Sequence, residues 1–161
     1  MTASGIVQIH SVVAALRPHI EWAVEAVFGM PVALRWQPQP AAPGHFKCEF
    51  PWRGVPNIVD ELGSELISCK QVRFEIMEDA PAGGLGRRVC FTPALGVFNG
   101  VTNELGDLIV DENRLRTIMG INAPSRPLAE RLDELLGKPW DDELEVFRHG
   151  EAPVRWLHAV S

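Results

Sequence analysis

The sequence predicts a single α+β domain whose first half is a ferredoxin-like βαββαβ unit. Within residues 1–78, apolar residues alternate as in strands or recur at helical spacing, in the order strand, helix, strand, strand, helix, strand. That order is the split βαβ arrangement, so we expect an antiparallel sheet with both helices on one face. Residues 79–161 are predicted to add a hairpin, short helices and a closing strand, and a chain of 161 residues suits one domain.

The first strand and the first helix follow from the apolar pattern near the amino terminus. Residues 5–10 are β-branched and nearly all apolar, which predicts a central strand buried on both faces. The helix that follows runs to Phe28 and is stopped by Gly29. Pro18 leaves two alternatives open: either the regular helix starts there after a turn, or the helix is kinked at that position.

The next strands bracket a proline-rich loop and a second helix. Residues 32–37 are predicted to form the second strand and residues 45–50 the third. Between them, the prolines and the glycine of residues 38–44 make a stiff surface loop. Pro56 opens the second helix, and residues 71–77 alternate between apolar and charged side chains, which predicts a fourth strand.

The second half is predicted to add strands and then helices. Residues 87–91 are expected to be a strand, and residues 95–102 to pair with residues 107–110 in a hairpin. These strands extend the first sheet or form a small second one. Asp111 then caps the first of two helices, and Gly137 stops the second.

The carboxyl-terminal segment combines tryptophans with charges of both signs. Pro139 suits a first helical position, which predicts a short helix over residues 139–147 that Gly150 stops. Residues 154–156 are then predicted to form a closing strand. The first helical turn carries three consecutive acids, which we interpret as complements of the helix dipole in preference to a cation site: Asp141, Asp142 and Glu143.

Composition argues against several classes of protein. The net charge is −6 at pH 7, whereas nucleic-acid binding depends on cationic contacts with phosphates. No apolar run is long enough to span a bilayer and no signal-peptide pattern opens the chain, so we expect a cytoplasmic protein without membrane insertion. Cys48, Cys69 and Cys90 lie in or beside apolar stretches, which predicts buried thiols. No histidine pair has metal-ligand spacing, and we expect neither metal nor cofactor.

Five stretches of the sequence resemble a known family. They are WQPQPAAPG at residues 36–44, HIEWAV at 19–24, TPALG at 92–96, LGKPWDDELE at 136–145 and PVRWLH at 153–158. Through them, nearly the whole chain resembles an actinobacterial family of domains of unknown function. The resemblance implies no established activity, cofactor or catalytic residue. Genes of that family often lie near those of fatty-acid synthesis, which implies cytosolic lipid metabolism as a context.

Aromatic residues form the first candidate site. If the proline loop and the closing segment meet at one end of the sheet, they would form an amphipathic patch for a protein partner. The residues of this patch are Trp36, Trp52, Trp140, Arg155 and Trp156. Tryptophans are equally expected in the core, so that alternative stays open.

Arginines and histidines form the second candidate site. The arginines that could hold an anionic group are Arg35, Arg53, Arg87 and Arg88. The glycines of residues 83–86 precede a predicted strand, so we expect a hairpin loop there and not a phosphate loop. His10 and His19 flank the first connection between strand and helix and could act as acid or base, although a structural role is more frequent.

These features lead to two hypotheses of different classes. The first is a non-catalytic accessory or regulatory protein that binds a cytosolic protein partner, in fatty-acid or acyl-CoA metabolism, because no catalytic constellation is recognisable. The second is a small enzyme or binding domain for an anionic metabolite such as a coenzyme A ester. A pocket that joins histidine to arginine would favour the second hypothesis, and a shallow aromatic patch the first. A homo-oligomer stays open in either case.

Overall fold

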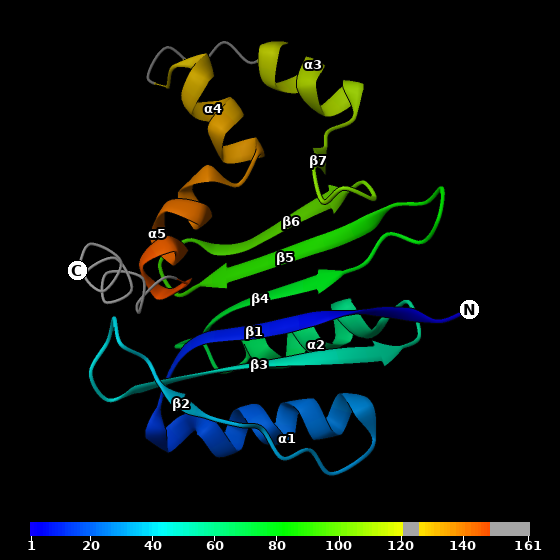
Figure 1. Ribbon diagram of the computed structural model, residues 1–161. Coiled ribbons are helices and arrows are strands. Elements are labelled where there is room, and N and C mark those ends of the chain that lie inside the picture. The colour runs from blue at the N-terminus through cyan, green and yellow to red at the C-terminus, as the bar shows by residue number, and fades with distance from the viewer. Residues whose placement is uncertain (121–125, 149–161) are drawn as a thin grey trace, which may run out of the picture.

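The computed structural model describes residues 1–120 and 126–148, which fold around one antiparallel sheet of seven strands (Figure 1). The order across the sheet is β2-β3-β1-β4-β5-β6-β7. The strands are β1 (Ala3–Val13), β2 (Gln37–Pro38), β3 (His45–Gly54), β4 (Arg73–Glu78), β5 (Gly86–Thr92), β6 (Gly96–Thr102) and β7 (Leu108–Ile109). The mixed α+β class with an antiparallel sheet, predicted from the sequence, is therefore confirmed.

The described residues also form five α-helices, distributed over both faces and one edge of the sheet (Figure 1). They are α1 (Arg17–Phe28), α2 (Ile58–Ile67), α3 (Glu112–Gly120), α4 (Leu128–Leu135) and α5 (Lys138–Arg148). Helices α1 and α2 pack on one face, as expected, and α5 packs on the opposite face. Among the described residues, no helix has the length and apolar character needed to cross a membrane.

Strand β1 is the centre of the first half because it pairs with β3 on one side and β4 on the other. The predicted strand at residues 5–10 is confirmed and continues to Val13. Its register shifts after Ile9 against both neighbours, which indicates a β-bulge. The consecutive residues His10 and Ser11 are both buried at this bulge, whereas Ile6 is 41% exposed. Burial on both faces is thus limited to the second half of the strand.

Helix α1 decides between the two alternatives for Pro18. The helix begins at Arg17, directly after a 3₁₀ turn (η1, Ala14–Leu16), so Pro18 stands in its first turn, where a missing N–H is tolerated. Gly29 ends it with φ of +68°, a conformation that glycine adopts without strain. The helix therefore starts close to Pro18, and the residues before it belong to β1 and η1.

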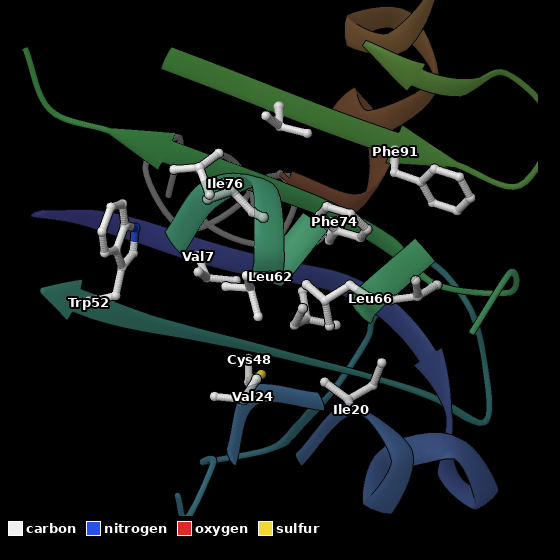
Figure 2. Packing of buried hydrophobic residues seen from close by; sticks show 14 of the residues in the cluster. Val7, Ile20, Val24, Cys48, Trp52, Leu62, Leu66, Phe74, Ile76 and Phe91 are labelled. Carbon is white, nitrogen blue, oxygen red and sulfur yellow. The ribbon is translucent and has the colours of Figure 1, made fainter. Parts of the chain in front are cut away.

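The face of the sheet that carries α1 and α2 holds the main hydrophobic core (Figure 2). Alternate residues of β4 point into it, since Phe74 and Ile76 are fully buried. Helix α2 contributes Leu62 and Leu66, which lie four residues apart on one face of the helix. Burial of each such side chain contributes roughly 1.5–3 kcal/mol, so this layer fixes the position of both helices on the sheet.

The predicted second strand at residues 32–37 is wrong, because only Gln37 and Pro38 pair with β3. Residues 31–36 are tied to α1 instead of to a strand. The indole nitrogen of Trp36 donates to Glu21 at 2.9 Å, and the backbone N–H of Val32 donates to Glu25 at 3.3 Å. The alternation of half-buried and exposed residues that suggested a strand therefore arises from packing against the helix side of the core.

The second half confirms most of the predicted elements. Strands β5, β6 and β7 extend the first sheet and do not form a second one. Asp111 caps α3 by accepting a hydrogen bond from the backbone N–H of Arg114 at 2.8 Å. Gly137 follows α4 with φ of +79°, and α5 covers the predicted helix at residues 139–147. Gly150 and the predicted closing strand at residues 154–156 lie outside the described residues.

The pairing of β1 with β4 predicts a strict requirement for glycine at position 5. A Cβ atom at Gly5 would stand 1.7 Å from the carbonyl oxygen of Met77 and 2.8 Å from the indole nitrogen of Trp52. We expect Gly5→Ala to lower the free energy of unfolding by about 3 kcal/mol or more, because the two strands must separate. Urea denaturation measures this loss. Gly120→Ala, where a Cβ meets nothing within 4 Å, is the control and should leave stability nearly unchanged.

Candidate functional site

Helix α5 covers the face of the sheet opposite to α1 and α2. Trp140 and Leu144 are buried there against Cys90 and Phe98. The indole nitrogen of Trp140 donates to the carbonyl oxygen of Gly96 at 2.9 Å. Because this apolar cluster is small, charged side chains make much of the remaining contact between α5 and the sheet.

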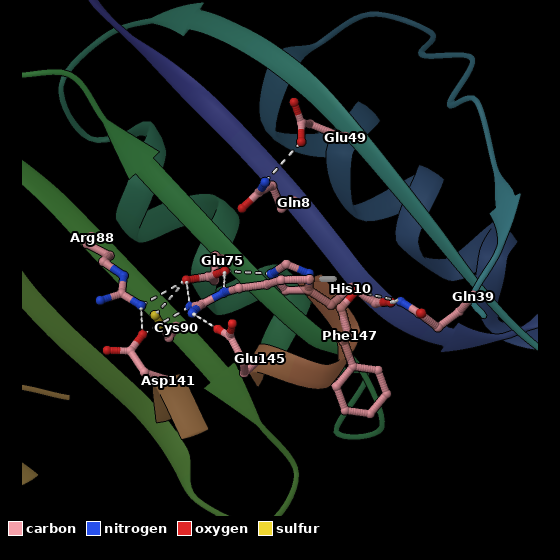
Figure 3. A network of polar contacts seen from close by, with 11 residues as sticks. Gln8, His10, Gln39, Glu49, Glu75, Arg88, Cys90, Asp141, Glu145 and Phe147 are labelled. Carbon is pink, nitrogen blue, oxygen red and sulfur yellow. Dashed lines mark hydrogen bonds and ion pairs between the residues drawn. The ribbon is translucent and has the colours of Figure 1, made fainter. Parts of the chain in front are cut away.

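The carboxylate of Glu75 lies at the centre of these charged contacts (Figure 3). Its Oε1 accepts hydrogen bonds from Arg88 at 3.0 Å and from Arg148 at 2.5 Å. Its Oε2 accepts hydrogen bonds from Arg148 at 3.0 Å and from Nε2 of His10 at 2.6 Å. Glu75 is only 4% exposed, so one buried carboxylate joins β1, β4, β5 and α5.

The charges of this cluster balance one another. Burial alone would raise the pKa of Glu75, but hydrogen bonds from His10 and Arg148 outweigh burial and hold that pKa well below its usual range. The carboxylate is consequently ionised and accepts only, so Nε2 of His10 carries a proton. Asp141 of α5 contacts both Arg88 and Arg148. Two carboxylates thus face two guanidinium groups, as a buried ion cluster requires.

The three acids at the start of α5 contact separate cations. Asp141 belongs to the Glu75 cluster, Asp142 pairs with Lys138 at 2.6 Å, and Glu143 accepts a hydrogen bond from Arg73 at 3.2 Å. The interpretation as complements of the helix dipole is therefore incomplete, since two of the three acids hold the helix to the sheet. They do not converge on one point, and the described residues contain no group of three metal ligands.

The tryptophans expected to share a patch are distributed over separate parts of the molecule. Trp52 belongs to the core under α1 and α2 and donates to a backbone carbonyl of β4, whereas Trp140 lies under α5. Trp36 is half-buried against α1. Arg155 and Trp156 lie outside the described residues. Trp52 and Trp140 therefore have core roles on opposite faces, and the structure does not bring them together.

The two candidate histidines also lie apart. His10 is buried and bonded to Glu75, whereas His19 is exposed on α1 with its ring edge-on to Trp22, at 5.1 Å between ring centroids.

Arg88 belongs to the Glu75 cluster, and Arg87 forms a bidentate pair with Asp60 of α2. These two arginines are therefore engaged within the protein. Residues 83–85 lie in the connection between β4 and β5 and Gly86 begins β5, which agrees with the predicted hairpin loop.

Three other cations have no such partner. Within residues 1–120 and 126–148, no hydrogen bond or ion pair engages the side-chain nitrogens of Arg35, Arg53 or Lys47. Arg35 and Arg53 were candidates from the sequence, and Lys47 was missed. In a chain whose net charge is −6, unpaired cations on neighbouring segments mark a surface suited to an anion.

Arg35 and Arg53 border a groove along the outer edge of β3, which we name the edge groove. It encloses about 530 Å³ between α1, residues 30–35 and the second half of β3. Apolar side chains make up most of its walls: Val24, Phe28, Met30, Val32, Leu34, Phe50 and Trp52. Arg35, Arg53 and Glu49 supply its charges. Because residues 31–36 do not pair with β3, the groove occupies the place that a regular second strand would have filled.

A second hollow, which we name the basic pocket, adjoins the edge groove. It encloses about 350 Å³ and is lined by residues of β1, β3 and α5, among them His10, Lys47 and Arg148. Arg35 and Glu49 line both hollows, so the two adjoin each other at these residues. Glu49 is held by Gln8, which donates to it at 2.9 Å. The apolar groove thus lies next to a pocket lined by histidine, arginine and lysine.

Strand β3 carries a proline at the edge groove, which argues against the addition of a further strand. Pro51 pairs with Ile6 of β1, and a proline in a sheet occurs where its missing N–H faces outward from an edge strand. An incoming strand would lack that donor at the middle of the open edge. The groove is therefore better suited to side-on binding of a small molecule than to β-augmentation.

The thiols near these hollows are not nucleophiles at neutral pH. Burial raises the pKa of Cys48 to about 12, and burial together with the charge of Glu75 raises that of Cys90 to about 12. Both are buried free thiols, as predicted, and Cys69 is half-buried.

The fold and the two hollows define a small α+β protein with an open, cation-bordered apolar groove beside one strand. The chain belongs to the family described as protein of unknown function (DUF3145), whose model matches residues 6–159. The resemblance to an uncharacterised family is thus confirmed over nearly the whole chain. No curated protein and no solved structure matches it.

Two neighbouring acids of α5 provide a matched test of the Glu75 cluster. We expect Asp141→Asn to lower the free energy of unfolding by about 1–2 kcal/mol, since it weakens charge-assisted hydrogen bonds to Arg88 and Arg148. Asp142→Asn should have no measurable effect, because its ion pair with Lys138 is exposed. Chemical denaturation compares the two. Equal losses would contradict the assignment of Asp141 to the cluster.

The cluster also predicts how stability depends on pH. Folding lowers the pKa of Glu75, so its ionised carboxylate stabilises the folded state. This contribution is fully present above the pKa of a glutamate in the unfolded chain, about 4.3, and is lost as the pH falls below that pKa. Glu75→Gln should cost about 3 kcal/mol or more at neutral pH, because two arginines lose their buried partner. The difference in the free energy of unfolding between wild type and Glu75→Gln, measured by urea denaturation, should become smaller at acid pH. A constant difference would contradict this account.

Proposed function

We propose that the protein is a non-catalytic binding protein for an anionic metabolite with an apolar tail, such as a coenzyme A ester, in the cytoplasm. The observation that supports this most strongly is that the edge groove and the basic pocket lie next to each other and share Arg35 as a lining residue. The apolar tail would lie along Phe28 and Phe50, and the anionic end would face Arg35 and Lys47. Such a pocket is the feature expected for the metabolite hypothesis.

The energetics of the groove suit a ligand with both characters. Each methylene that leaves water for the apolar walls contributes about 0.8 kcal/mol. A phosphate or carboxylate near Arg35 and Lys47 gains charge-assisted hydrogen bonds that neither side chain makes within the described residues. An apolar ligand alone would leave both cations unused, and a small anion alone would leave the groove filled with water. The combination favours an acyl thioester of a polyanionic carrier.

Binding without turnover is supported by the state of the reactive groups. Nε2 of His10 is bonded to Glu75, and the buried thiols of Cys48 and Cys90 are protonated at neutral pH. A nucleophile beside an activating base would be needed for covalent chemistry on a thioester. The arrangement favours a carrier, sensor or regulatory subunit.

A second candidate function is that of an accessory protein with a protein partner. Large apolar side chains are exposed on two helices, with Trp22 of α1 60% and Met119 of α3 67% exposed. Exposed tryptophan and methionine are enriched at protein interfaces. The two functions are compatible, because these residues do not line the edge groove.

We place this function in fatty-acid or acyl-CoA metabolism, the context that the family resemblance suggested.

We also propose that residues 1–78 are a ferredoxin-like unit. The interleaved order β2-β3-β1-β4, with α1 and α2 on one face, supports this.

Calorimetric titration with acyl-CoA esters of increasing chain length tests the proposal. From butyryl-CoA to octanoyl-CoA, affinity should rise by roughly fourfold per methylene that enters the groove, the equivalent of about 0.8 kcal/mol. Free coenzyme A should bind weakly because the groove stays empty, and octanoate should bind weakly because it offers a single charge. An affinity independent of chain length would contradict the assignment of the groove.

A matched pair of lysine substitutions tests the anionic end. Lys47→Gln should weaken octanoyl-CoA binding by about tenfold, equivalent to one charge-assisted hydrogen bond. Lys70→Gln, an exposed lysine outside both hollows, should bind as wild type does. Equal affinity of the two variants would show that the basic pocket does not hold the anion.

A further inference from the structure

Among the described residues, helix α3 contacts α4 but buries none of its own apolar side chains fully. None of its nine residues is buried, and Met119 and Leu115 are 67% and 36% exposed. Within the described residues, its hydrogen bonds to the rest of the chain include the Asp111 cap and one from Arg131 of α4 to the carbonyl oxygen of Ile118 at 2.6 Å. A helix this short is marginal in water without an apolar face to bury. Helix α3 therefore presents a surface that a further contact would stabilise.

The exposed face of α3 is both apolar and basic. Leu115, Ile118 and Met119 follow the spacing i, i+3, i+4 and form one stripe, of which Leu115 and Met119 are exposed and Ile118 is half-buried. Arg114 and Arg116 stand one residue to either side of Leu115, which at 3.6 residues per turn places them on both flanks of the stripe. Arg116 also pairs with Glu112 of the same helix, an exposed ion pair of the kind that contributes little to stability. The complementary surface must then be apolar at its centre and acidic along its sides.

A surface of that kind lies between α1 and α2, on the side of the helices away from the sheet. Two hollows of about 370 and 410 Å³ follow each other there and share Glu65. We name them together the helix groove. Its α1 wall carries Trp22 and its floor includes the small residues Ala23 and Ser64, which allow another helix to approach closely.

The helix groove is acidic. Glu61 and Glu65 are exposed and, within the described residues, form no ion pair, whereas Asp60 is taken by Arg87. No lysine or arginine lines either hollow. The charge of the groove is therefore opposite to that of α3, and Trp22 is the aromatic anchor typical of interface centres.

We propose that the protein self-associates, with α3 of one copy docked in the helix groove of another. Leu115 and Met119 pack against Trp22 and Ala23, and Arg116 faces Glu65. Helix α3 lies at one end of the molecule and α1 at the other (Figure 1), so α3 does not reach the helix groove of its own chain. A two-fold arrangement makes the contact twice and closes the assembly. This inference is independent of the edge groove, whose residues take no part in it.

Sedimentation equilibrium over a range of protein concentrations tests the contact, with a charge exchange as the decisive variant. Wild type should show reversible, salt-sensitive association. Arg116→Glu and Glu65→Arg should each weaken the association constant by about tenfold or more, because like charges then face each other. The double variant should recover most of the loss. Glu130→Arg, an exposed site on α4 outside both surfaces, should associate as wild type does.

Three results would overturn the proposal: a monomer at every concentration, single reversals that change nothing, or a double variant that associates no better than the singles. Circular dichroism melts of each variant exclude unfolding as the cause of lost association. Octanoyl-CoA binding measured on the same samples keeps the two proposals separable, since neither reversal touches the edge groove.

Discussion

The ionised carboxylate of Glu75 is the interaction on which the arrangement of the second half depends. It is surrounded by donors from three other elements. Without it, His10 would lose its carboxylate partner, and Arg88 and Arg148 would lose their buried acid and keep the less buried Asp141. The apolar contact beneath α5 is small, so the orientation of this helix is set mainly by ion pairs. These ion pairs add geometric specificity that apolar packing alone would not provide, because an arginine fork fits a carboxylate in few orientations. The same helix contributes Phe147 and Arg148 to the basic pocket, so the cluster also shapes a binding surface.

The sequence predicted the elements of this site better than their contacts. The alternation of residues 71–77 placed Glu75 on the face opposite to Phe74 and Ile76, and the pattern of residues 139–147 predicted the helix above it. Its partner Arg148 is 73 residues away along the chain, and no local pattern encodes that contact. The one available signal was a charged residue in the middle of a central strand, which must be paired or exposed.

The segment at residues 31–36 shows why a correct pattern led to a wrong element. Its alternation has the period of a strand, and that period reports only which side chains face an apolar surface. Here the surface is the helix side of the core, and hydrogen bonds to Glu21 and Glu25 of α1 replace the ladder. The tryptophans illustrate the same limit. The sequence left open whether the tryptophans belong to the core or to a binding patch. Only the three-dimensional packing shows that Trp52 and Trp140 are buried and that Trp22 is exposed.

The separation of residues 31–36 from β3 links the fold to the proposed function. A paired strand would have closed the edge of the sheet, whereas the observed segment leaves an apolar groove with unpaired cations beside it. The most direct test of this account is a titration of isotopically labelled protein with octanoyl-CoA, followed by backbone amide shifts. The account predicts that the largest changes fall on residues 30–35 and 47–53 and that the helix groove and α3 stay unaffected. Shifts centred elsewhere, or none at saturating ligand, would contradict it.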